Sequence, residues 1–100
     1  MYYLTDTTSE NGCLRVLPGT HRKEHPLHAQ LGLAHSDDVR SGDTEEEAQA
    51  RVAASPAHAP QPDEVHVPVK AGDVVIGDAR VLHGAVANTT DEPRALLTLW

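Results

Sequence analysis

The chain has 100 residues, enough for one small domain, and its 8 basic and 15 acidic residues give a formal net charge of −7. A domain of this size buries only about 60–65% of its unfolded surface, so we expect modest stability. The acidic balance provides no broad basic surface for phosphates, which argues against a nucleic-acid partner. No apolar run approaches the ~20 residues that cross a membrane, and the first residues form no signal peptide. We therefore expect a cytoplasmic protein with no membrane partner.

Residues 2–22 predict two short strands joined by a turn-rich loop. The second strand covers Cys13–Leu17. Asn11-Gly12 supplies the positive φ that such a connection needs, and Pro18-Gly19 ends the second strand. Cys13 is the single cysteine and cannot form an internal disulfide, so we expect it to be a small core side chain.

Residues 23–64 are polar and irregular, with one helix expected from Thr44 to Ala54. Asp43 or Thr44 can cap this helix, and three glutamates fall in its first turn, where the helix dipole favours negative charge. Ser55-Pro56 ends the helix, and a proline-rich loop follows.

Residues 65–100 carry the strongest strand pattern of the chain. The three valines of Val65-His66-Val67-Pro68-Val69 alternate onto one face, and Pro68 favours an edge strand because it lacks an N–H. A turn over residues 70–73 leads into residues 74–77, which are apolar enough to predict a strand buried on both faces.

Two further strands are expected around His83 and over residues 94–100, separated by a turn. Four strands in so short a segment leave no room for a helical crossover, so the sheet is predicted to be antiparallel. We expect a single, mainly β domain over residues 1–100, whose three parts are residues 2–22, 23–64 and 65–100.

His83 and Arg94 are the residues whose chemistry stands out in this last part. A histidine can hold a metal ion, and an arginine can grip a carboxylate through two parallel hydrogen bonds. In a regular strand Arg94 shares a face with Leu96, Thr98 and Trp100, so its guanidinium is expected to point inward. A buried guanidinium without a partner is costly, which makes a bound carboxylate a reasonable complement.

Stretches at both ends of the chain share a pattern with one known family. In chain order they are Asn11-Gly12-Cys13-Leu14-Arg15-Val16-Leu17-Pro18-Gly19-Thr20-His21-Arg22, Ala71-Gly72-Asp73-Val74-Val75, His83-Gly84, Asn88 and Arg94. They resemble the carboxy-terminal half of the phytanoyl-CoA dioxygenase family. The resemblance implies a partial double-stranded β-helix, a cupin-like jelly roll of antiparallel strands with one short helix in the middle insertion. It also implies an oxidation that uses Fe(II), O2 and 2-oxoglutarate, usually hydroxylation of a small organic or acyl substrate.

The resemblance assigns a role to each of the two residues. A facial triad of two histidines and one carboxylate leaves three positions on iron open, two for the 2-oxoacid and one for O2. His83 matches the family's distal histidine ligand. Arg94 matches the arginine that holds the far carboxylate of 2-oxoglutarate, a task for which a fixed, always-charged guanidinium is suited.

The remaining two iron ligands of the family form a His-x-Asp pair, which the resemblance places upstream of the segment that begins at Tyr2. One such pair does occur in the chain, His35-Ser36-Asp37. About one histidine followed two residues later by an acid is expected by chance from this composition. Neighbouring glycines and serines indicate a loop there, which argues against a metal-binding pair. The sequence alone leaves a metal role for His35 and Asp37 open.

Each of the two site residues also has a plainer interpretation. A single histidine between valine, leucine and glycine is often only a core or surface side chain. Arg94 can form a salt bridge to Asp91 or Glu92 at the start of its strand, which contributes little when exposed.

Other motifs point to no further enzyme class. Four histidines could suggest a zinc cluster, but Pro26 interrupts the helix that would align two of them, and no Cys-x-x-Cys is present. We therefore expect a solvated, histidine-rich loop at His21, His25, His28 and His35. No Gly-x-Ser-x-Gly elbow and no phosphate-binding glycine loop occur.

Two hypotheses of different classes follow. The chain is part of an iron and 2-oxoglutarate dioxygenase, with His83 as metal ligand and Arg94 as cosubstrate anchor. Alternatively, it is a catalytically silent half-barrel that binds a partner or only folds. A half-barrel exposes unpaired strand edges and apolar faces, so we expect weak stability or self-association through those edges.

Overall fold

A computed structural model describes residues 1–32, 45–56 and 58–99 of the chain. The chain divides into two compact units, Met1–Lys23 with Pro62–Trp100 and Glu24–Gln61. Among the described residues, the β-strands all fall in the first unit and the helices in the second. The single domain expected from the sequence stays a prediction.

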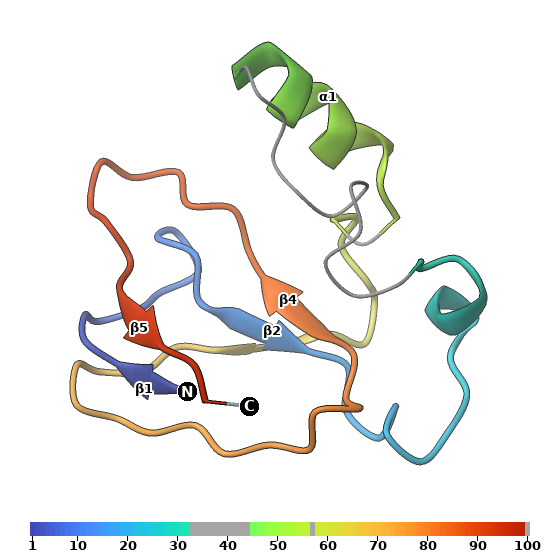
Figure 1. The fold of residues 1–100 in the computed structure, drawn as a ribbon, viewed down its shortest axis with the longest axis horizontal. Helices are drawn as coiled ribbons and strands as arrows, with labels where there is room; N and C mark the ends of the chain where they lie inside the picture. Colours follow the sequence, from blue (N-terminus) through green and yellow to red (C-terminus); the bar gives the residue numbers. More distant parts are fainter. Residues whose placement is uncertain (33–44, 57, 100) are drawn as a thin grey trace. The chain divides into compact units, whose positions relative to one another are not determined.

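The first unit contains a three-stranded antiparallel sheet in the order β3-β2-β4 (Figure 1). The central strand β2 (Leu14–Val16) pairs with β3 (Val65–Val67) on one side and with β4 (His83–Ala85) on the other. Strand β3 is an edge strand of this sheet, which confirms the position predicted from Pro68.

A second, two-stranded sheet joins the two ends of the chain. Strand β1 (Tyr2–Tyr3) pairs antiparallel with β5 (Leu96–Leu97), so that Tyr3 lies opposite Leu96. On the other side of β1, Tyr2 forms an isolated bridge with Val74. The first residues of the chain therefore lie between two segments that come from its second half (Figure 1).

The turn before β2 has the conformation that the sequence predicts. Gly12 has a φ of 93°, a left-handed value that side-chain-bearing residues rarely adopt. The N–H of Cys13 donates to the carbonyl of Thr8 at 2.9 Å and closes the loop. The next turn contains Gly19 with a φ of 84°, directly after β2 and Leu17.

The core of the first unit is small. Cys13 has no exposed surface and Tyr3 is 1% exposed, so the cysteine is the core side chain that the sequence predicts. Burying one large apolar side chain contributes about 1.5–3 kcal/mol. A core of this size gives a modest stability. Its buried apolar residues are Tyr3, Cys13, Leu14 and Leu17.

Two strand predictions in the second half of the chain are wrong in extent. Residues 74–77 form only the single bridge at Val74, and the expected burial on both faces is absent, since Val74 is 58% and Ile76 is 91% exposed. This segment pairs with β1 along one edge only. The side chains of Val74 and Ile76 are not covered by another element among the described residues. The strand expected over residues 94–100 is limited to Leu96–Leu97, and Leu99 is 90% exposed.

The second unit contains a short 3-10 helix, η1 (Pro26–Ala29), and the helix α1 (Glu45–Ala54). In η1 the side chain of His25 caps the first turn by accepting from the N–H of Leu27 at 3.2 Å. The helix predicted between Thr44 and Ala54 is confirmed over Glu45–Ala54, with its acidic first turn. No described helix is long and apolar enough to cross a membrane.

The fold class predicted from the sequence is confirmed at its coarser level. The described chain is mainly β, built from short antiparallel strands with helix in the middle segment.

Candidate functional site

His83 begins β4 and lies directly opposite Val16 of β2. Its side chain is exposed, and its Nδ1 is 2.7 Å from the carbonyl oxygen of Val81. Because a carbonyl can only accept, this bond places the imidazole proton on Nδ1 and the lone pair of the neutral ring on Nε2. Nε2 is therefore the nitrogen suited to bind a metal ion, while Nδ1 fixes the orientation of the ring.

The same sheet also carries a polar network centred on Arg15 and Glu64. Arg15 alternates with Val16 along β2 and forms an ion pair with Glu64 at 3.1 Å. Glu64 also contacts the Nε2 of His66 at 3.1 Å. Since Arg15 is 8% exposed, this network holds a mostly buried charge in place and stabilises the sheet.

Arg94 lies just before β5 and is half-buried. Its Nη1 donates to the carbonyl oxygen of Gly12, 82 residues earlier in the chain. The alternative predicted from the sequence, an ion pair with Asp91 or Glu92, does not form within the described residues. The guanidinium is thus directed toward the turn before β2 and away from the neighbouring carboxylates.

The phenol of Tyr3 lies in the electrostatic field of Arg94. Burial raises the pKa of Tyr3 above its ordinary value, while the positive charge of Arg94 opposes part of this increase. The buried thiol of Cys13 adds a smaller upward contribution to the same pKa. The Tyr3 hydroxyl is therefore a neutral hydrogen-bond donor at neutral pH, close to a fixed positive charge.

His83 and Arg94 lie beside opposite ends of the same short segment, residues 12–16. His83 lies on β4 of the three-stranded sheet, whereas Arg94 lies just before β5 of the two-stranded sheet. They are linked through residues 12–16, because Arg94 binds the carbonyl of Gly12 and His83 faces Val16. Four residues of extended chain span at most roughly 14 Å, which bounds the distance between these two anchor points.

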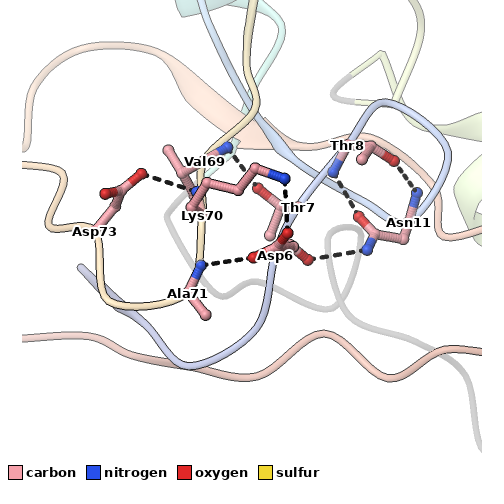
Figure 2. Close-up of polar contacts among 8 residues, drawn as sticks. All are labelled: Asp6, Thr7, Thr8, Asn11, Val69, Lys70, Ala71 and Asp73. Carbon is pink, nitrogen blue, oxygen red and sulfur yellow. Dashed lines mark hydrogen bonds and ion pairs between the residues drawn. The ribbon is translucent and has the colours of Figure 1, made fainter.

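A cluster of polar contacts fixes the loop between β1 and β2 against residues 69–73 (Figure 2). The carboxylate of Asp6 accepts from the Nζ of Lys70 and from the N–H of Ala71, both at 2.8 Å. The hydrogen bond from Lys70 is the main cause of a lowered pKa of Asp6. Asp73 accepts from the N–H of Lys70 at 2.8 Å and completes the turn, in which Gly72 has a φ of 95°.

The cluster gives one residue of the family-like sequence pattern a structural role. Asp73 belongs to the Ala71-Gly72-Asp73 motif, and here it caps a turn. Asp6 and Lys70 escaped the sequence analysis because their contact joins residues 64 apart, and no local pattern marks either residue. The same applies to Tyr3, whose position beside Arg94 follows only from the pairing of the first strand with the last.

The described residues do not complete an iron site. They contain no group of three or more histidine, cysteine or acidic side chains able to hold a metal ion. The zinc cluster considered for the histidine-rich loop is therefore absent from the described part of that loop, where His25 caps η1. His35 and Asp37 lie outside the described residues.

With this geometry in place, the chain can be compared with known proteins. Residues 1–96 match the model of the phytanoyl-CoA dioxygenase (PhyH) family. The chain belongs to this family. The match extends from β1 into β5, and so includes the His83 strand, Arg94 and the middle segment. At the level of the family, membership indicates an oxygenase-type enzyme that depends on Fe(II) and 2-oxoglutarate. No solved structure matches the chain significantly.

Proposed function

We propose that the chain forms the carboxy-terminal part of an Fe(II)- and 2-oxoglutarate-dependent dioxygenase with a jelly-roll fold. His83 serves as one iron ligand, and Arg94 binds the far carboxylate of 2-oxoglutarate. The observation that carries the proposal is the position of the Arg94 guanidinium. It is half-buried, forms no ion pair with Asp91 or Glu92 within the described residues, and donates to the carbonyl of Gly12. Family membership over residues 1–96 supports the same function.

The two residues act by orientation and charge. The hydrogen bond between His83 Nδ1 and the Val81 carbonyl fixes the orientation of the ring, and we propose Nε2 as the metal-binding nitrogen. The guanidinium of Arg94 retains donors besides the one on Gly12, and a carboxylate can accept from two of them at once. Arg94 contacts Gly12 at one end of residues 12–16 and His83 lies opposite Val16 at the other end, so one short segment positions both residues.

Iron, when bound, supplies the activation of O2 that oxidation of an unactivated carbon requires. One protein ligand cannot hold Fe(II) firmly. We propose that the other two iron ligands come from a His-x-Asp pair outside the described residues. The substrate in this proposal is a small organic or acyl compound.

A second function rests on the exposed apolar side chains of the first unit. Val74, Ile76 and Leu99 are 58%, 91% and 90% exposed, which is typical of a surface that another element covers. Together with the incomplete ligand set, these residues favour a catalytically silent half-barrel that binds a partner or a second copy. Metal binding distinguishes the two functions.

Titration with Mn(II), a redox-inert and paramagnetic substitute for Fe(II), tests the role of His83. In the presence of 2-oxoglutarate we expect the electron paramagnetic resonance signal of free Mn(II) to fall for the wild type. His83→Ala abolishes the effect, and His58→Ala, a change of a histidine in the second unit, leaves it unchanged. Equal binding by His83→Ala and wild type contradicts the proposed ligand, and no binding by the wild type favours the silent half-barrel.

A further inference from the structure

Tyr3 and Arg94 are diagonal neighbours on the inward face of the β1–β5 pair. Tyr3 lies opposite Leu96, and Arg94 precedes Leu96 by two residues, so the two side chains project from the same face. The N–H of Leu4 donates to the carbonyl of Ala95 at 2.9 Å and extends the pairing toward Arg94. The backbone therefore places a phenol and a guanidinium on the same face of this strand pair.

The hydroxyl of Tyr3 is poorly satisfied by the protein itself. Tyr3 is 1% exposed, and its hydroxyl donates to the Sδ of Met1 at 4.0 Å within the described residues. A thioether is a weak acceptor, and a buried hydroxyl without a good partner destabilises a fold. A phenylalanine would fill this position equally well as a core side chain. The hydroxyl thus needs an explanation other than folding.

The positive charge of Arg94 also lacks an acidic partner among the described residues. Its described hydrogen bond uses Nη1 and a neutral backbone carbonyl, and no acidic side chain among the described residues forms an ion pair with it. The guanidinium and the neutral phenol are both hydrogen-bond donors that face the core. Their joint complement is an acceptor that carries negative charge.

We propose that the hydroxyl of Tyr3 and the guanidinium of Arg94 bind one carboxylate together, the far carboxylate of 2-oxoglutarate. This inference rests on the proposed function and adds Tyr3 as a cosubstrate-binding residue. Arg94 supplies the charge, and Tyr3 donates a further hydrogen bond from the adjacent strand. The side chain of Met1, which is half-buried and covers the hydroxyl, is flexible enough to move aside when the ligand enters.

Paired tyrosine variants test the proposal, because Tyr2 is the adjacent tyrosine of β1 and is 43% exposed. We would measure the dissociation constant of 2-oxoglutarate for the full chain by isothermal titration calorimetry. A hydrogen bond to a charged group is lost in Tyr3→Phe, so we expect the dissociation constant to rise about 10-fold or more. Tyr2→Phe leaves it unchanged. Pyruvate, which lacks the far carboxylate, binds the wild type and Tyr3→Phe equally weakly.

A second readout separates binding from folding. Entry of a carboxylate changes the near-ultraviolet absorption of the tyrosine that it contacts, so the difference spectrum on adding 2-oxoglutarate persists in Tyr2→Phe and disappears in Tyr3→Phe. We expect the urea midpoint of Tyr3→Phe to equal or exceed that of the wild type, because the lost hydroxyl contacts only a thioether.

The failures of the two proposals are distinguishable. If the wild type binds 2-oxoglutarate, Arg94→Gln loses it and Tyr3→Phe keeps it, the role of Tyr3 is overturned and the proposed function stands. If the wild type does not bind 2-oxoglutarate, both are overturned for this chain. Binding that survives Arg94→Gln overturns the shared carboxylate site.

Discussion

Replacing Gly12 with alanine tests the geometry on which the position of Arg94 depends. Gly12 has a φ of 93°, and an added Cβ would lie 3.2 Å from the backbone carbonyl oxygen of Val86. The left-handed conformation costs an alanine about 1–2 kcal/mol. The close contact adds about 1–2 kcal/mol, because its partner is backbone and cannot rotate away. We therefore expect Gly12→Ala to lower the free energy of unfolding by about 2–4 kcal/mol.

Two other glycines serve as matched controls. Gly19 has a φ of 84° with no atom within 4 Å of an added Cβ, so Gly19→Ala carries only the backbone cost of about 1–2 kcal/mol. Gly77 has neither a positive φ nor a close neighbour, so Gly77→Ala is neutral or stabilises by up to about 1 kcal/mol.

Urea unfolding followed by near-ultraviolet circular dichroism measures this series, because both tyrosines lie in the first unit. The expected order of midpoints is Gly77→Ala highest, then Gly19→Ala, then Gly12→Ala. Equal midpoints for Gly12→Ala and Gly19→Ala would refute the contact with Val86, and equal midpoints for the whole series would refute the backbone argument as well.

Three further predictions concern the contacts around the sheets. Glu64→Gln removes the charge that pairs with the mostly buried Arg15 in the 3.1 Å contact, and we expect the urea midpoint to fall by an amount equivalent to about 1–3 kcal/mol. Asp6, whose folded pKa is lowered by Lys70, stabilises the fold above pH 4 and loses this contribution as the pH falls through the folded pKa. Asp6→Asn should therefore flatten the pH dependence of the thermal midpoint below pH 4, and an unchanged profile contradicts the contact. Ile76→Asp introduces charge into the exposed apolar face and should reduce self-association in sedimentation velocity; a wild type that sediments as a compact monomer contradicts that expectation.

Local sequence signals predicted the parts of the fold that depend on neighbouring residues. Asn11-Gly12 marked a turn because glycine alone enters the left-handed region freely, and Gly12 does so. The acidic first turn marked the helix that the structure forms over Glu45–Ala54. The 3-10 helix at Pro26 was missed, since its cap is a histidine, which is not a common capping residue.

Contacts between distant residues could not be predicted in this way. The continuous apolar run over residues 74–77 predicts a buried strand but does not show whether other elements cover it, and the structure leaves Val74 and Ile76 exposed. The partner of Arg94 is a backbone carbonyl 82 residues away, while the sequence offered two acids within three residues. Tyr3 reaches the same region only because β1 pairs with β5, a register set by the whole first unit.

The roles proposed for His83 and Arg94 come from the family resemblance more than from local sequence pattern. Each residue alone has a plainer interpretation, and the family pattern is what singles the two out. Their positions relative to residues 12–16 follow from two contacts. His83 lies opposite Val16 in the three-stranded sheet, and Arg94 donates a hydrogen bond to Gly12.

The most direct test of the proposed dioxygenase site is an anaerobic titration of Fe(II) and 2-oxoglutarate that follows the visible charge-transfer band of the bidentate chelate. We predict a band for the wild type that is lost in His83→Ala and requires a higher 2-oxoglutarate concentration in Arg94→Gln. A band of equal strength in His83→Ala, or no band in the wild type, would contradict an iron and 2-oxoglutarate site formed by this chain.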